Sequence, residues 1–371
     1  MTGPRYTPLV AGLPATVPFV GPETQERQRG RPFEARIGAN ENVFGPSPKA
    51  IAAMNAAAAD AWMYADPENL ELKQALAAHH GVAPDNIVVG EGIDGLLGYL
   101  NRLLVEEGTP VVTSLGAYPT FNYHVACCGG RLVTVPYKDD REDPEALLAA
   151  ARAAEAPLVY FANPDNPMGT WQDADTVQTL IDGLPENTVL CLDEAYIEFA
   201  PEPMTPPIAP PLDVSHPGVI RFRTFSKAYG MAGARIGYGI AEASLALAFN
   251  KVRNHFGVNR VALAGALAAL ADTAYLAETQ RNVWQACARI ADIARAHGLQ
   301  PLPTATNFVA IDCGRDGHYA KKVLDALVAR DVFVRMPFVE PQNRCIRVSA
   351  GRPEDLAIFE RVLPEALADA D

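Results

Sequence analysis

The sequence predicts an α/β protein, with a large domain built on a mainly parallel sheet flanked by helices and a smaller α+β domain after it. Two observations predict this fold class. Short apolar runs alternate with amphipathic helical segments between residues 70 and 222, which is typical of parallel β-α-β units. Polar or glycine-rich motifs directly follow several of these runs, at the edge of a parallel sheet where ligands bind.

The elements of the large domain, expected over residues 40–250, follow in chain order. Helical spacing begins after Pro48 and returns over 70–80, ahead of the first apolar run. Strands are expected at 87–89, 110–113, 132–135, 158–161, 189–192 and 219–222. Helices are expected between them at 96–104, 120–128, 144–154 and 174–181. The proline-dense stretch 204–217 is expected to be an irregular loop.

The regions on either side of this core differ in composition. Residues 1–39 are rich in Pro, Gly and Arg, and we expect an N-terminal arm that packs with the small domain or a partner subunit. An alanine-rich segment at 241–271 has a helical period and is expected to link the domains. In the small domain, 251–371, helices are expected at 275–297, 319–330 and 353–367, and strands at 308–312, 332–335 and 345–348.

Composition excludes several classes of protein. A hydrophobic fraction of 49% and a charged fraction of 20% exclude a disordered chain. The net charge of −13 disfavours nucleic acid and anionic membrane as partners, because both need a basic surface. No uncharged apolar run is long enough to span a membrane. The six cysteines and seven histidines show no metal spacing, so we expect no metal and a cytoplasmic protein with reduced thiols.

Two charged residues come directly after expected strands. Asp193 follows the buried run TVLCL, and a carboxylate there is costly unless it is paired. Taken alone, a helix cap or a surface acid explains Asp193 equally well. Lys227 follows the next strand in RTFSKAYG, where a lone lysine is ordinarily solvated. Arg235 stands in a glycine-rich string just beyond; glycine lets a ligand approach the backbone, and arginine binds phosphate in a forked geometry.

Two loops complete the pattern. VGEGID at 89–94 joins a strand to a helix and would present backbone N–H groups to an anion, although a capped turn without a ligand fits equally well. NPDNPMG at 163–169 contains two Asn-Pro steps, which demand an extended, rigid loop. The amide of Asn166 is then held for a fixed acceptor, or the loop is a plain proline-rich turn.

Together these motifs place a lysine, a carboxylate, an amide and an anion cradle on successive β-α loops. The set fits a cofactor with an aldehyde, a protonated ring nitrogen, a phenolic oxygen and a phosphate, and pyridoxal 5'-phosphate (PLP) has all four. From about residue 38 to 348 the sequence resembles fold-type I PLP enzymes of the aminotransferase superfamily, most of all the histidinol-phosphate aminotransferases. The motifs behind this resemblance, besides the Asn-Pro loop, are ANENVFGPSP at 39–48, YADP at 64–67, DEAY at 193–196, SK at 226–227, RIGY at 235–238, TNF at 306–308 and CIR at 345–347.

The resemblance implies a seven-stranded sheet and a role for each matched residue. Lys227 would form the Schiff base with the aldehyde and then act as base and acid in the proton shift. Asp193 would keep the ring nitrogen protonated, while Asn166 and Tyr196 bond the phenolic oxygen. At the cofactor phosphate, the implied contacts are Ser226, Arg235 and the N–H groups of Ile93 and Asp94. Phe121 would stack on the ring face. Tyr64 would reach the phosphate of the cofactor bound to the neighbouring subunit of a homodimer.

On the substrate side, the resemblance implies that Arg347 binds the carboxylate or phosphate of the substrate. Arg335 matches a second arginine directed at the substrate phosphate, although a solvated edge-strand arginine is the alternative. Asn40 and Asn307 are expected to line the same side. The chain departs from the family pattern at four positions: Phe19 and Phe121 replace tyrosines, Ile93 replaces a serine and Val43 replaces a proline. Phe19 puts histidinol phosphate itself in doubt, because a phenol donor is absent.

Three functions remain open on the sequence alone. The leading expectation is an aminotransferase that moves the amino group of L-histidinol phosphate, or of an aromatic amino acid, to 2-oxoglutarate. A broad-specificity aminotransferase is the nearest alternative. A PLP-dependent decarboxylase of the threonine-phosphate type uses a similar arginine pair. A PLP-fold module kept only for binding is disfavoured by the complete set of Lys227, Asp193 and Arg235.

Overall fold

A central sheet of seven strands, in the order β2-β8-β7-β6-β5-β3-β4, organises the chain. The computed structural model describes residues 3–15, 20–201 and 204–371, so Phe19 lies outside the described residues. Across the sheet the strands are Ile87–Gly90 (β2), Gly237–Ala241 (β8), Val219–Thr224 (β7), Val189–Asp193 (β6), Leu158–Ala162 (β5), Pro110–Ser114 (β3) and Arg131–Val135 (β4). Neighbours from β7 to β4 are parallel, and β8 is antiparallel to β2 and β7. The predicted fold class is confirmed.

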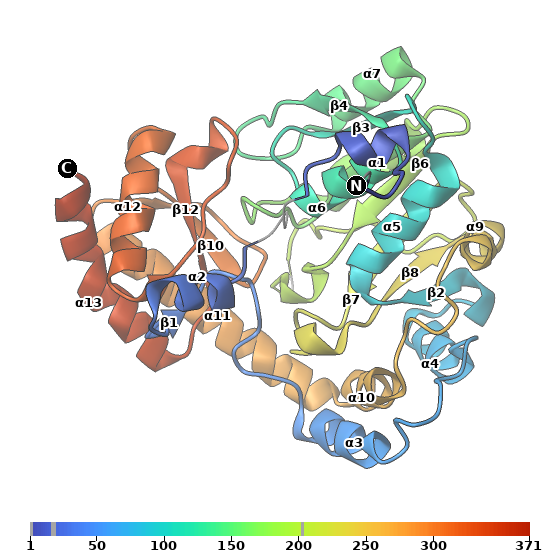
Figure 1. Ribbon diagram of the computed structural model, residues 1–371, viewed down its shortest axis with the longest axis horizontal. Coiled ribbons are helices and arrows are strands. Elements are labelled where there is room, and N and C mark those ends of the chain that lie inside the picture. The colour runs from blue at the N-terminus through green and yellow to red at the C-terminus, as the bar shows by residue number, and fades with distance from the viewer. Residues whose placement is uncertain (1–2, 16–19, 202–203) are drawn as a thin grey trace.

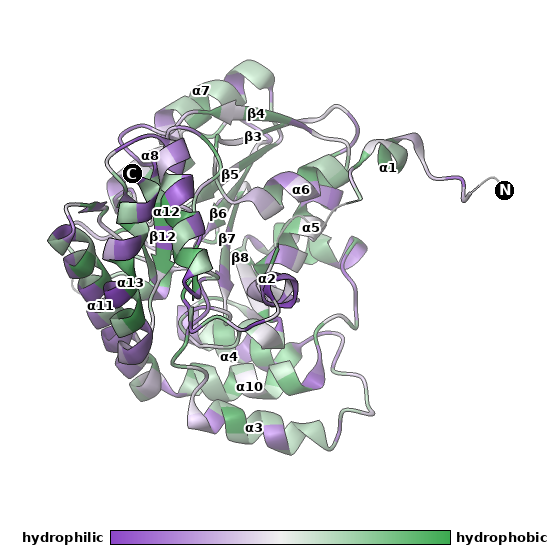
Figure 2. Cartoon of the chain, turned by 60° about the vertical axis from the view of Figure 1, so that its left-hand side comes forward, coloured by the Kyte–Doolittle hydropathy of each residue, from purple (hydrophilic) through white to green (hydrophobic). Residues whose placement is uncertain are grey.

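Helices cover both faces of this sheet, and Figure 2 shows α8 on one side with α5 and α6 on the other. Leu158 and Tyr160 of β5 belong to the core under α5 (Gly92–Leu104) and α6 (Pro119–Cys127). Val159 and Phe161 belong to the core under α7 (Pro144–Ala154) and α8 (Ala174–Asp182). Because both faces are covered, every residue of β5 and β6 is buried, which explains why these strands form continuous apolar runs.

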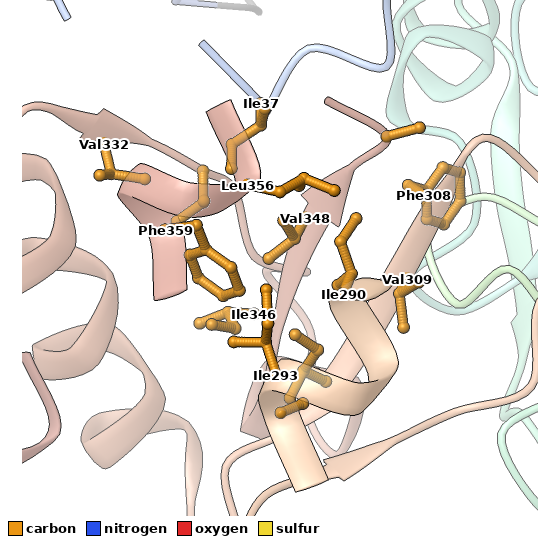
Figure 3. Packing of buried hydrophobic residues seen from close by; sticks show 14 of the residues in the cluster. Ile37, Ile290, Ile293, Phe308, Val309, Val332, Ile346, Val348, Leu356 and Phe359 are labelled. Atoms are coloured by element: carbon orange, nitrogen blue, oxygen red, sulfur yellow. The ribbon is translucent and has the colours of Figure 1, made fainter. Parts of the chain in front are cut away.

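A second core lies in the C-terminal part of the chain (Figure 3). Its antiparallel sheet has the order β12 (Cys345–Ser349), β10 (Phe308–Asp312) and β9 (Gln300–Pro301). The helices α11 (Thr273–Ala296), α12 (Gly317–Ala329) and α13 (Pro353–Ala370) supply apolar residues to this core. Ile290, Ile346 and Phe359 are fully buried in it.

The N-terminal arm joins this second core, as Figure 1 shows for α2 and β1 beside the C-terminal helices. β1 (Ala35–Arg36) pairs in parallel with β11 (Val332–Phe333), and Ile37 is buried in the same cluster. The arm also contains α1 (Pro8–Gly12) and α2 (Pro22–Arg29). Sequence analysis missed α2 because PETQERQR has no apolar face. The division into an arm (1–39), a large domain (40–250) and a small domain (251–371) remains our proposal.

The helical period over 241–271 does not correspond to a single helix. β8 occupies the residues up to Ala241, and α9 (Ala243–Ala248) is short. The helix α10 (Arg260–Ala271) starts anew, where the Asn259 side chain accepts a hydrogen bond from the N–H of Ala262 at 2.7 Å. Alanine favours helix throughout the segment and so hid these breaks. β8 was missed because it contains Gly239, where a Cβ would lie 2.8 Å from the Phe222 ring.

The remaining elements complete the large domain and its connections. α3 (Pro48–Ala58) and α4 (Leu70–His80) pack with α10 on a third apolar cluster beside β2 and β8. Short 3-10 turns occur at Pro84–Asn86, Ile197–Phe199, Ala232–Ala234, Phe249–Lys251 and Gln342–Arg344. Within the described ranges no single helix is long and apolar enough to cross a membrane, and only α10 and α11 taken together, across an 83° bend, meet those criteria.

Candidate active site

The motifs singled out in the sequence meet in one cavity of about 210 Å³. It lies where β5, β6 and β7 end, at Ala162, Asp193 and Thr224. Strand ends, β-α loops, the N-terminal segment and the small domain all contribute to its wall. The predicted site residues that line it are Asn40, Ile93, Asp94, Asn166, Asp193, Tyr196, Ser226, Lys227, Arg235 and Arg347.

Asp193 is a buried carboxylate at the last position of β6. Its Oδ2 accepts a hydrogen bond from the Tyr160 hydroxyl at 2.8 Å, and its Oδ1 accepts one from the N–H of Ala195 at 3.0 Å. Burial raises the pKa of Asp193 to about 6, against the lowering effect of these two hydrogen bonds. A carboxylate in this position gains from a cationic partner, so it suits a protonated ring nitrogen.

Lys227 is the buried amine of the cavity. Its Nζ donates a hydrogen bond to the Asn40 carbonyl at 3.0 Å and lies 5.3 Å from the centre of the Tyr196 ring. Burial, and after it the positive charge of Arg347, lowers the pKa of Lys227 to about 8. More of this amine is therefore neutral near pH 7 than of an ordinary lysine, and the neutral form is the nucleophile and proton acceptor.

An anion cradle lies at the N-terminal end of α5. The Arg235 guanidinium donates to Ser226 Oγ at 3.2 Å and to the Glu91 carbonyl at 3.3 Å. A Cβ on Gly92, which has a φ of +78°, would lie 2.4 Å from that guanidinium, so only glycine fits there. The N–H groups of the first helical turn, those of Ile93 and Asp94 among them, have no acceptor within the helix. Helix terminus and arginine together suit a phosphate.

Arg347 of β12 enters the cavity from the small domain. Its guanidinium donates to Asn166 Oδ1 and lies 5.1 Å from the centre of the Phe308 ring. Burial lowers the pKa of Arg347, and its Nε has no hydrogen-bond partner among the described residues. A buried guanidinium with an unused donor suits an anionic substrate group. Since Asn166 Oδ1 faces Arg347, its Nδ2 is left to donate into the cavity.

The expected stacking of Phe121 on the cofactor ring is corrected by the structure. The Phe121 ring is fully buried and stacks on Tyr160, with ring centres 4.5 Å apart, outside the cavity wall. Tyr118 lines the cavity instead. It stands at the start of α6, before Pro119, and an aromatic residue at a strand-to-helix junction was the signal that could have found it. Tyr160 was missed because it lies inside an apolar run.

Three further predicted residues lie away from the cavity wall. Asn307 is fully buried and donates to the Asn40 carbonyl at 3.0 Å, so it supports the N-terminal segment and does not reach the substrate side as expected. Arg335 pairs with Arg347 across an antiparallel bridge and donates to the Val20 carbonyl. Tyr64 is 78% exposed and packs on Phe256, with ring centres 4.7 Å apart. Its predicted contact with a neighbouring subunit stays a prediction.

The residues present fit PLP. Asp193 is a buried carboxylate, the absence of a Cβ at Gly92 lets the Arg235 guanidinium lie against the start of α5, and Lys227 is a buried amine of lowered pKa. Among the described residues no group of three or more His, Cys, Asp or Glu side chains is placed to hold a metal ion.

Comparison with known proteins agrees with this geometry. The family model for aminotransferase class I and II matches residues 35–362. A histidinol-phosphate aminotransferase 2 from Ralstonia nicotianae is 36% identical, over 100% of this chain and 98% of the relative. The crystal structure of histidinol-phosphate aminotransferase from Sinorhizobium meliloti in complex with pyridoxal-5'-phosphate is 55% identical and superposes with a TM-score of 0.96, covering 100% of this chain and 99% of the other.

The chain therefore belongs to the aminotransferase class I and II family. The predicted activity, an aminotransferase that uses PLP, is confirmed. The L-threonine-O-3-phosphate decarboxylase from Porphyromonas gingivalis superposes with a TM-score of 0.75, covering 90% of this chain and 99% of its own, but it is only 19% identical, which is a likeness of fold alone. The decarboxylase alternative is therefore not favoured.

Proposed function

We propose that this aminotransferase takes its amino group from L-histidinol phosphate and passes it to 2-oxoglutarate. The observation that carries the proposal is Arg347, a buried guanidinium in the cavity wall whose Nε has no hydrogen-bond partner among the described residues. Arg335 pairs with it across an antiparallel backbone bridge, so a second arginine lies close behind the cavity wall. Proteins named histidinol-phosphate aminotransferase are similar over the whole chain, which supports a phosphate-bearing donor.

The chain's own residues divide the work of the reaction. The cofactor, when bound, supplies an electron sink for the substrate carbon that loses its proton. Asp193 would keep a proton on the ring nitrogen, and Asn166 and Tyr196, which line the same cavity, would donate hydrogen bonds to the phenolic oxygen. Lys227, whose pKa is lowered to about 8, would accept the proton from the substrate carbon that bears the amino group and return it on the cofactor side. Arg347 orients the substrate by its anionic group.

A panel of amino donors tests the substrate. The purified PLP-bound enzyme is mixed, without a keto acid, with L-histidinol phosphate, glutamate, phenylalanine, tyrosine or O-phosphothreonine, and its visible absorbance is followed. We expect histidinol phosphate to bleach the band fastest and 2-oxoglutarate to restore it. Faster bleaching by an aromatic donor contradicts the proposed substrate and leaves the aminotransferase activity intact. Release of carbon dioxide from O-phosphothreonine would revive the decarboxylase alternative.

We also propose a homodimer with shared active sites, acting in the cytoplasm. The ring pair of Tyr64 and Phe256 supports the dimer, because these side chains are 78% and 53% exposed, and exposed aromatic groups are typical of interfaces. All six cysteines are free, as in a reducing compartment. Sedimentation tests the dimer: a fully active monomer contradicts it.

A further inference from the structure

Asn40 is held on one side by Ser349, a residue that the reaction itself does not use. Asn40 is buried and has a φ of +55°. Its backbone N–H donates to Ser349 Oγ at 3.0 Å, and Ser349 Oγ donates to Asn40 Oδ1 at 2.9 Å. Asn40 Nδ2 in turn donates to the Tyr196 hydroxyl oxygen at 3.1 Å. Ser349, at the end of β12, is thus linked through one amide to the tyrosine in the cavity.

The donors and acceptors in this series of hydrogen bonds fix the direction in which each proton points. Ser349 Oγ accepts from a backbone N–H, so its own proton must find an acceptor, and Asn40 Oδ1 is the acceptor that the structure provides. With Oδ1 engaged there, Nδ2 faces Tyr196 and can only donate. The Tyr196 oxygen accepts that bond, which leaves its O–H to point elsewhere, into the cavity that it lines.

The reverse orientation of the Asn40 amide is disfavoured. Nδ2 would then face Ser349 Oγ, which already accepts the Asn40 N–H, and the serine proton would lose its acceptor among the described residues. Oδ1 would face Tyr196 and draw the phenol proton away from the cavity. A buried hydroxyl left unpaired costs free energy, so the Ser349 hydroxyl selects the first orientation.

We propose that Ser349 is a positioning residue: through Asn40 it directs the Tyr196 hydroxyl proton into the cavity, toward the phenolic oxygen of the bound cofactor. The inference rests on the proposed role of Tyr196. It assigns to the small domain a part in cofactor electronics, because Ser349 pairs with Phe308 across the β10-β12 sheet. The catalytic lysine shares the same support, since Lys227 Nζ and Asn307 Nδ2 both donate to the Asn40 carbonyl.

The charged groups around Tyr196 make no hydrogen bond to the Ser349 side chain, so we expect them to stay in place in a Ser349 variant. Lys227 lies 5.3 Å from its ring, and Arg347, Asp193 and Asp165 act on its hydroxyl through their charges. A change in cofactor titration caused by Ser349→Ala therefore reports the proton direction at Tyr196.

The test is a pH titration of the visible absorbance of the PLP-bound enzyme. A hydrogen bond donated to the phenolic oxygen favours the deprotonated form of the chromophore, so losing it raises the midpoint. We expect Ser349→Ala to raise the midpoint by about 0.5–1 pH unit, and Ser349→Thr, which keeps the hydroxyl, to restore it. Thr188→Ala is the matched control, because Thr188 is a buried hydroxyl that donates to the Ala156 carbonyl at 2.8 Å and directly precedes β6, whose far end is Asp193. It should lower stability and leave the midpoint unchanged.

A double-mutant cycle with Tyr196→Phe separates positioning from general loosening. We expect Tyr196→Phe to raise the midpoint by itself, and Ser349→Ala to add nothing in that background. An unchanged midpoint in Ser349→Ala, or an equal shift in both backgrounds, overturns the inference. If Ser349→Ala does not fold, Asn40→Asp replaces it: the new carboxylate can only accept, so the midpoint must rise, and no rise overturns the inference. A wild-type protein without a visible band, by contrast, would refute the proposed function.

Discussion

The two halves of the cavity are built in different ways. The cofactor half comes from the ends of adjacent strands and the turns that follow them, as with Asp193 at the end of β6 and the pair of Ser226 and Arg235 beyond β7. The substrate half is assembled over long distances, since Arg347 reaches Asn166 and Ser349 reaches Asn40. The difference teaches that a motif predicts a side chain's position best when its own segment supplies the support.

The largest expected effect lies in the cofactor half. Lys227→Ala should lower kcat by about a thousandfold or more, because the variant loses both nucleophile and proton carrier, and should abolish the visible band of the lysine-bound cofactor. Absorbance spectra and steady-state rates measure this. Lys251→Ala, at an exposed position, is the control and should behave as wild type. A surviving band in Lys227→Ala would contradict the assignment of the lysine.

A change in the substrate half should separate the two halves. Arg347→Ala should lower kcat/KM for phosphate-bearing donors about 100-fold, as expected for losing a charge-assisted hydrogen bond from a buried site, while the cofactor stays bound. The control is Arg361→Ala, whose side chain is 63% exposed. If Arg347→Ala lost PLP and kept its affinity for the substrate, the division into two halves would be contradicted, because Arg347 would then belong to the cofactor half.

The pH dependence of cofactor binding sharpens the role of Asp193. Its raised pKa of about 6 in the cofactor-free protein means that ionisation costs stability as pH rises from the unfolded value of about 4 through 6. A bound cation offsets this cost. The rise in Tm on adding PLP should therefore be about 2–4 °C larger at pH 8 than at pH 5. Thermal melts measure it, and Asp193→Asn should remove the contribution of this carboxyl; an unchanged difference in that variant would exclude Asp193 as its source.

The smallest expected effect is at the rim of the substrate half. Arg335 donates to the Val20 carbonyl and lies outside the cavity wall, so any contact with the substrate phosphate is weak. Arg335→Ala should therefore raise KM for L-histidinol phosphate by roughly tenfold or less. KM for glutamate, which has no phosphate, should stay unchanged. Steady-state kinetics with both donors measures the contrast. Equal changes for the two donors would refute a phosphate-specific contact.

The sequence predicted the cofactor residues well and the surrounding aromatic and amide residues poorly. Asp193, Lys227 and Asn166 line the cavity as expected. Phe121 does not, because the packing of its ring on Tyr160 depends on a strand elsewhere in the chain. Asn307 was expected near the substrate, and its contact with the Asn40 carbonyl cannot be read from TNF alone.

By itself, the sequence determined the fold class and the chemistry of the cofactor half. Buried parallel strands require continuous apolar runs, and the residue after such a run lies at the ligand-binding edge of the sheet, so Asp193 is placed by its own segment. Only the tertiary structure decided how the small domain meets that edge: which donor faces Tyr196, where Arg347 points, and which aromatic ring lines the cavity. These depend on hydrogen bonds and packing between residues far apart in the chain, such as Asn40 and Ser349, and local sequence pattern carries no information about such pairs.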